Sequence, residues 1–479
     1  KRRDLIKKQL IKVAAGQRVI LSEQLLTENT ALTEWPQVLK GRFDLESFTL
    51  PPELIIATLE QKQRVFGVTD QQGKLLPQFL LVCNIECDAP KDIITGYNRS
   101  VHAHLQDTQY LYKKDLQQSF TDRSKALKQL TFHKDLGSWE EKTRRIVKLA
   151  THISKKLPTE TDSEAIKAAG LLCKCDINSE IVATFPNLKG AIAHQYALHQ
   201  GAPKECADAI QEHYLPQNND DPVPTSQLGS IIAIADKLDT VVGIFGTYKT
   251  LTKDCTPYNI PSATLGILKT IIEKQLPLDL MDLIKHAKQG FKNKFSNNEV
   301  IDRAFDYMYQ QLKNHYINLN TNQSVMAAVE ARFITKPYDF HCRIHAVSQL
   351  RNHPQGPAIV KALIKINDII SQQTRKLKET AINHSLCQSP QQQAFAQKIS
   401  TLSQNTPGAD QYTSNLLELT TILSEPINQF LVSIESPSDT PSINTNRMVI
   451  LKTIVSIFRQ IADITKLSFI AEDNQALQN

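Results

Sequence analysis

The segment 233–240 (Ala-Ile-Ala-Asp-Lys-Leu-Asp-Thr) constrains the fold more than any other part of the chain. Apolar residues recur around it at helical spacing, in a stripe formed by Ile231, Ala235, Leu238, Val242 and Phe245. Asp236 and Asp239 lie three residues apart, so both carboxylates project from one side of the same helix. The pattern predicts a packed core helix that holds two carboxylates in place. Such a helix is typical of a metal-dependent hydrolase, or of a former metal site reused as a scaffold.

Length and composition predict a protein that is mainly α and has several domains. A chain of 479 residues is too long for one hydrophobic core. Glycine is scarce, with 16 residues, and frequent Leu, Ile, Ala, Lys and Gln favour helix. Strand patterns at 64–68 and 75–82 flank the turn residues 70–73 (Asp-Gln-Gln-Gly), which predicts a β-hairpin. We therefore expect an α+β segment near the N-terminus, followed by helices from about Leu116.

The distribution of cysteine and of charge predicts a cytoplasmic protein. The eight cysteines are scattered without a regular framework, as expected for reduced thiols. No apolar run approaches the roughly 20 residues that span a bilayer, so no membrane association is expected. The formal charge of +6 is compatible with an RNA partner without requiring one. Because Lys1 falls within a helical pattern, we expect the chain to be a fragment of a longer protein.

The candidate catalytic chemistry is that of a metal phosphohydrolase of the His-Asp (HD) type. Asp176 and Asp236 stand where such an enzyme keeps metal ligands. Cys175 occupies the position of the histidine that would precede Asp176, which removes a nitrogen donor. This favours a structural role for Asp176, Asp236 and Asp239 and predicts no metal site. The sequence also lacks both glycine-rich phosphate-binding motifs, so no ATP site is expected in this chain.

Basic residues on predicted helices are candidates for contacts with RNA phosphates. They form three groups: Lys142, Arg144 and Arg145; Lys361 and Lys365; and Arg447 and Lys452. Each group taken alone is more typical of a solvated helix face.

Many separated segments together resemble the β subunit of the bacterial two-subunit glycyl-tRNA synthetase. The matching segments occur in collinear order and include 32–36, 74–79, 142–146, 185–190, 212–216, 235–240, 243–246, 339–347 and 461–464. The resemblance covers essentially the whole chain and lacks only the large N-terminal region of that family.

The resemblance implies a division of the chain into four parts. Residues 1–115 would be the end of an α+β tRNA-binding region, and residues 116–290 a helical HD-like domain. Residues 291–325 would form a helical connector, and residues 326–479 a helical anticodon-binding domain of the DALR-like type. In this family two α and two β chains assemble, and the α subunit uses ATP and Mg to perform the chemistry. The β subunit binds tRNA(Gly) and needs no cofactor of its own.

Together with the basic groups above, the resemblance gives a set of candidate tRNA-binding residues. These are Arg99, Lys142, Arg144, Arg145, Arg343, Lys361, Lys365, Arg447 and Lys452. The sequence departs from the family where His102, His104, Pro261 and Ser262 replace arginines. Each lost phosphate contact would weaken RNA binding and lower its salt slope by about one unit. The alternatives are a degenerate RNA-binding paralogue without a ligase role and an HD-type metal phosphohydrolase.

Overall fold

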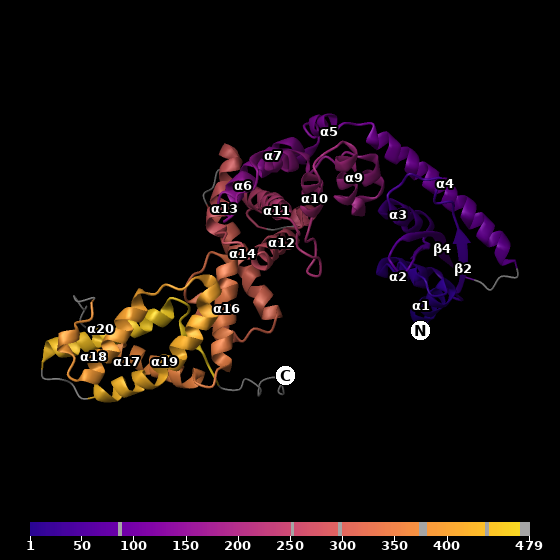
Figure 1. Ribbon diagram of the computed structural model, residues 1–479. Coiled ribbons are helices and arrows are strands. Elements are labelled where there is room, and N and C mark those ends of the chain that lie inside the picture. Colours follow the sequence, from indigo (N-terminus) through magenta and orange to yellow (C-terminus); the bar gives the residue numbers. More distant parts are fainter. Residues whose placement is uncertain (85–88, 251–252, 296–298, 373–380, 436–439, 470–479) are drawn as a thin grey trace. The chain divides into compact units, whose positions relative to one another are not determined.

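The computed structural model describes residues 1–84, 89–250, 253–295, 299–372, 381–435 and 440–469 (Figure 1). These residues are mostly helical, with a small antiparallel sheet near the N-terminus, which confirms the expectation of a mainly α protein. The chain divides into two compact units, and each is described separately. The first comprises Lys1–Ser154 and Glu160–Asp239, and the second comprises Lys155–Thr159 and Thr240–Asn479. The four-part division implied by the resemblance stays a prediction.

The first unit begins with a four-stranded antiparallel sheet. Its strands are β1 (Arg18–Val19), β2 (Gln37–Arg42), β3 (Phe66–Thr69) and β4 (Leu75–Cys83), in the order β1-β3-β4-β2. Strands β3 and β4 form the predicted hairpin, with Gly67 opposite Phe79 and a register shift between Gly67 and Thr69. Asp70 Oδ1 fixes the turn by accepting hydrogen bonds from the backbone nitrogens of Gln72 and Lys74, at 2.9 and 2.8 Å.

Four helices accompany this sheet: α1 (Arg2–Ala14), α2 (Glu23–Leu32), α3 (Pro52–Gln63) and α4 (Pro90–Leu116). Helix α1 contacts β2 and α2, and the long α4 contacts β2 and α3 (Figure 1). The core between α1 and the sheet contains Ile6, Leu10, Leu26, Phe66 and Leu80, each no more than 3% exposed. The apolar side chains of α1, spaced three to four residues apart, therefore pack against one face of the sheet and cover it.

The rest of the first unit is helical apart from one short hairpin. Its elements are α5 (Phe120–Ala126), β5 (Thr131–His133), β6 (Gly137–Ser138), α6 (Trp139–Ser154), α7 (Ser163–Leu172), α8 (Glu180–Thr184), α9 (Ala191–His199), α10 (Lys204–Glu212) and the part of α11 (Gln227–Thr247) up to Asp239. Helix α6 packs against α7, and α10 packs against α9 and α7. The β5–β6 hairpin was not expected from the sequence, because these strands have only three and two residues.

The second unit is a set of helices with no strand among its described residues. The helices are α12 (Ile260–Glu273), α13 (Leu280–Gly290), α14 (Val300–Asn318), α15 (Gln323–Glu330), α16 (Pro337–Asn352), α17 (Gly356–Ser371), α18 (Pro390–Gln404), α19 (Tyr412–Ser433) and α20 (Pro441–Arg459). Helix α16 packs along α19, α17 contacts α19 and α20, and α18 contacts α20 (Figure 1). Within the described ranges, none of the helices combines the length and apolar character that crossing a membrane requires.

Candidate functional site

Helix α11 carries the two predicted carboxylates into the interior of the first unit. Its apolar residues Ile231, Ala235 and Leu238 are fully buried, and Asp236 and Asp239 are only 8% and 2% exposed. The helix is therefore packed, as its apolar spacing predicted, and both carboxylates lie in the interior. These acids can remain ionised only if positive charges or hydrogen-bond donors are buried beside them.

Two cations from α6 surround Asp239. Lys142 Nζ lies 3.1 Å from Asp239 Oδ2, and Arg145 binds the same carboxylate through Nε at 2.6 Å and Nη2 at 3.1 Å. Lys142 and Arg145 are three residues apart, so α6 presents both to α11 from one face. The paired side chains of Lys142 and Asp239 are each only 2% exposed. Lys142 and Arg145 thus neutralise an acid of the interior.

Asp236 contacts two ammonium groups. Lys174 Nζ is 2.7 Å from Asp236 Oδ2, and Lys142 Nζ is 3.0 Å from Asp236 Oδ1. Lys174 also lies 2.8 Å from His213 Nε2 and 4.4 Å from the centre of the Tyr214 ring. Burial acts to raise the pKa of Asp236, but Lys142 and Lys174 outweigh it and hold this pKa far below its usual value. Asp236 is therefore a buried carboxylate that the chain itself keeps charged.

Asp176, the third predicted acid, is held by uncharged donors. Its Oδ2 accepts a hydrogen bond from the backbone nitrogen of Gly190 at 2.8 Å, and its Oδ1 accepts one from the Tyr214 hydroxyl at 3.0 Å. Burial raises the pKa of Asp176. Gly190 has φ +78°, and a Cβ there would lie 2.8 Å from the Tyr214 ring, so glycine permits this close approach.

The polar centre of the first unit is therefore an internal charge network. Among the residues that the structure describes, no three His, Cys, Asp or Glu side chains gather closely enough to hold a metal ion. Instead Lys142, Arg145 and Lys174 occupy the space around Asp236 and Asp239. Chemically, this arrangement joins α6 and α11 by ion pairs.

His213 makes the stability of this network depend on pH. Burial, and next the Lys174 ammonium, hold the pKa of His213 well below its ordinary value of 6.5. Between the two pKa values the unfolded chain binds a proton that the folded chain does not bind, so stability falls as pH falls below about 6.5.

We expect the His213→Gln variant to lack this pH-dependent contribution to the free energy of unfolding. Urea unfolding at pH values below 6.5 should show a steeper dependence of the free energy of unfolding on pH for the parent chain than for the variant, by up to about 1.4 kcal/mol per pH unit. Parallel slopes would contradict a neutral buried His213.

The nine candidate tRNA-binding cations separate into a buried and an exposed set. The buried set is Lys142, Arg145, Arg343 and Arg447, each no more than 8% exposed. The exposed set is Arg99, Arg144, Lys361, Lys365 and Lys452. The structure therefore does not bring the nine together on one surface. In particular, Arg144 points outward and pairs with Glu140 at 2.6 Å, whereas its neighbour Arg145 points inward.

Arg343 and Arg447 both bind groups within the second unit. Arg343 Nε lies 2.7 Å from Asp339 Oδ2, and its Nη2 donates to the Tyr412 hydroxyl at 2.7 Å. Its guanidinium also stacks 4.5 Å from the centre of the Tyr412 ring, which joins α16 to α19. Arg447 Nη2 donates to Gln388 Oε1 at 2.5 Å. These contacts engage both guanidinium groups inside the second unit and leave the exposed set as the better candidates for binding phosphate.

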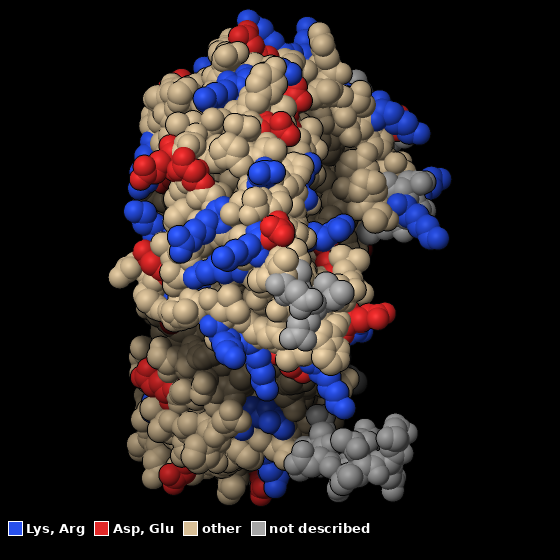
Figure 2. All heavy atoms as spheres, turned by 90° about the vertical axis from the view of Figure 1, so that its right-hand side faces the viewer, with Lys and Arg blue, Asp and Glu red and all other residues tan. Residues whose placement is uncertain are grey.

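Figure 2 shows how Lys and Arg lie on one face of the molecule. Basic side chains are spread across the face drawn, with acidic side chains between them. This distribution agrees with the mild formal charge of +6.

Sequence reasoning missed a second buried network, centred on Asp115. This carboxylate accepts hydrogen bonds from Arg123 Nη2 at 3.1 Å and from the Tyr196 hydroxyl at 2.8 Å. It also accepts from the backbone nitrogens of Glu180 and Ile181, at 3.1 and 3.0 Å, which caps the start of α8. Nothing in the periodicity indicates this network, because its members come from separate elements.

Comparison with known proteins identifies close relatives. The family model described as glycyl-tRNA synthetase beta subunit matches residues 1–331. A glycine–tRNA ligase beta subunit of Coxiella burnetii (strain RSA 331 / Henzerling II) is 37% identical over 473 residues, which are 98% of this chain and 68% of the relative. That of Haemophilus influenzae (strain PittEE) is 34% identical over 466 residues, 97% of this chain and 67% of the relative. That of Psychromonas ingrahamii is 32% identical over 472 residues, 98% of this chain and 68% of the relative.

Proposed function

The chain belongs to the glycyl-tRNA synthetase beta subunit family, and on this premise we propose that it binds tRNA(Gly) and positions it for aminoacylation. The observation that carries this proposal is the division of its charges. The interior acids are neutralised by lysine and arginine of the chain itself, while Arg99, Arg144, Lys361, Lys365 and Lys452 remain at the surface. This division argues against the HD-type phosphohydrolase, and the similarity to glycine–tRNA ligase beta subunits supports the ligase subunit over the paralogue without a ligase role.

The proposed mechanism is one of positioning. The exposed cations bind phosphates of the tRNA and set its orientation. In the second unit the helices from α16 to α20 would hold the anticodon arm, and the first unit would direct the acceptor end to the α subunit. The α subunit would supply the chemistry that depends on ATP and Mg, and holding the tRNA end nearby would lower the entropic part of the barrier. Two α and two β chains would assemble in the cytoplasm.

Neutralising surface lysines of the second unit tests this proposal. We expect the Lys361→Gln/Lys452→Gln double variant to bind tRNA(Gly) with a salt slope lower by about two units, because each phosphate contact contributes about one. The affinity of the double variant for tRNA(Gly) at low salt should also be lower than that of the parent chain, because two phosphate contacts are lost. The measurement is the equilibrium affinity for tRNA(Gly), by fluorescence anisotropy, at several salt concentrations.

Lys285→Gln is the matched control. Lys285 is an exposed lysine on α13 of the same unit and was not among the candidate residues. The Lys285→Gln variant should bind tRNA(Gly) with the same salt slope as the parent chain. An equal slope for the double variant and the control would contradict phosphate binding by Lys361 and Lys452.

A further inference from the structure

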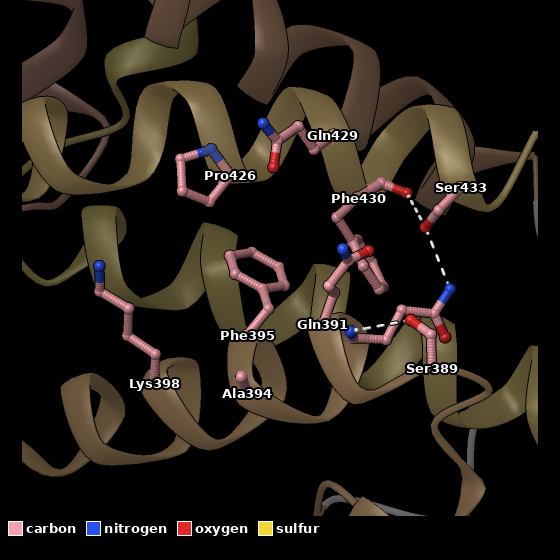
Figure 3. Close-up of a pocket in the computed structure, with 10 residues that line it drawn as sticks. Ser389, Gln391, Ala394, Phe395, Lys398, Pro426, Gln429, Phe430 and Ser433 are labelled. Carbon is pink, nitrogen blue, oxygen red and sulfur yellow. Dashed lines mark hydrogen bonds between the residues drawn. The ribbon is translucent and has the colours of Figure 1, made fainter.

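A hollow of about 280 Å³ lies between α18 and α19 in the second unit. Figure 3 shows its lining: Gln391, Phe395 and Lys398 come from α18, and Pro426, Gln429 and Phe430 come from α19. Phe395 and Phe430 point from opposite helices into the space between them. None of the cations implied by the resemblance lines this hollow.

The hollow has an aromatic floor and a polar rim. The rings of Phe395 and Phe430 lie 5.2 Å apart between centroids, and the two residues are only 9% and 4% exposed. Gln391 and Gln429 are exposed at the rim. The Gln429 amide donates to Glu425 Oε1 at 3.1 Å, which holds it along α19. The hollow thus offers ring surface below and amide donors and acceptors above.

Lys398 provides the charge of the hollow. It is the single formally charged residue among the described residues that line it. Its Nζ donates to the carbonyl oxygen of Ile422 over a long 3.4 Å. An exposed lysine held this loosely can turn toward an anion at low cost.

We propose that this hollow receives one unpaired base of the bound tRNA, an inference that rests on the proposed function. A splayed base has an apolar ring face, a polar edge and a phosphate attached through its sugar. Unpaired bases of RNA are commonly recognised by aromatic contact and by hydrogen bonds to the edge. Here Phe395 and Phe430 contact the ring, Gln391 and Gln429 bind the edge, and Lys398 binds the phosphate. Side-chain amides suit this role because they donate and accept together.

An apolar side chain from a protein partner fits the hollow less well. It would cover the two rings but would satisfy neither amide nor the Lys398 ammonium. A base uses all three parts of the lining. The hollow is therefore assigned to RNA, and a protein occupant is one outcome of the test below.

A double-mutant cycle between protein and RNA tests this assignment. The protein variant is Gln391→Ala/Gln429→Ala in the full chain, and the RNA variants are tRNA(Gly) molecules with one abasic nucleotide at each unpaired position. We expect the protein variant to bind natural tRNA(Gly) about tenfold more weakly, in the range of a single base contact. One abasic tRNA should bind the parent chain with a similar loss, and the two changes together should cause no further loss.

The controls separate this inference from the proposed function. Gln397→Ala removes an exposed glutamine of α18 that does not line the hollow, and it should leave affinity unchanged. The salt slope of Gln391→Ala/Gln429→Ala should equal that of the parent chain, because no charge is removed.

Unchanged affinity of the Gln391→Ala/Gln429→Ala variant, or losses that add for every abasic position, would overturn the proposal of a base-binding hollow without contradicting tRNA binding by the chain. Loss of α-subunit binding with RNA affinity intact would reassign the hollow to a protein partner. Failure of the parent chain to bind tRNA(Gly) would overturn both proposals.

Discussion

Replacing Asp239 by alanine should lower the free energy of unfolding of the first unit by about 3–5 kcal/mol. The substitution leaves Arg145, now 2.6 Å from Asp239, buried without that carboxylate, and leaves Lys142, now 3.1 Å from Asp239, paired with Asp236. An uncompensated charge in the interior costs far more than the loss of a surface ion pair. Urea unfolding followed by tryptophan fluorescence suits this measurement, because both tryptophans of the chain, Trp35 and Trp139, lie in the first unit.

Lys167→Ala is the control for this experiment. Lys167 pairs with Glu164 at 3.8 Å, and both side chains are more than half exposed. Its loss should change the free energy of unfolding by less than about 1 kcal/mol. If Asp239→Ala were no more costly than Lys167→Ala, the Asp239 network would not support the fold in the way described.

The Asp115→Ala variant is the second change for which we expect a large effect, again about 3–5 kcal/mol. It removes the acceptor for the Arg123 guanidinium and the Tyr196 hydroxyl, at 3.1 and 2.8 Å, and the cap of α8. The side chains of Arg123 and Asp115 are 0% and 1% exposed, so water cannot replace the lost partner without opening the core. The same fluorescence-detected urea titration measures the change.

Two further variants, Lys114→Ala and Asp115→Asn, provide the comparison for the stability of Asp115→Ala. Lys114 pairs with Glu180 at the surface at 2.5 Å, with both side chains nearly half exposed, so Lys114→Ala should cost less than about 1 kcal/mol. Asp115→Asn keeps one acceptor oxygen and should fall between the two. Similar stabilities for all three variants would rule out Asp115 as a centre of stability.

Local patterns in the sequence predicted the helix and the hairpin whose backbone geometry depends on residues close together in the chain. The apolar spacing around Asp236 and Asp239 identified α11, and Asp70 and Gly73 identified the hairpin of β3 and β4. In both cases a period or a turn residue determines local backbone geometry, and tertiary packing agrees with it. The mainly α character followed in the same way from composition.

The direction in which a charged side chain points could not be predicted from spacing. Lys142, Arg144 and Arg145 fall within four residues of α6, yet Arg144 is exposed and the other two are buried. A basic residue on a helix was expected to face water, and the carboxylates of α11 that draw two of them inward lie more than ninety residues away. Arg343 is buried for a similar reason, since its partner Tyr412 lies on another helix. The hollow between α18 and α19 exists only once those helices pack.

The interior position of Lys142 and Lys174 has a consequence for chemical labelling. An amine must be deprotonated and in contact with solvent to attack an acylating reagent, and these two side chains are only 2% and 5% exposed and are ion-paired with Asp236. Lysines such as Lys7, Lys361 and Lys452 on outer helix faces are open to the reagent. Acylation of Lys142 or Lys174 would therefore record the moments at which the first unit opens.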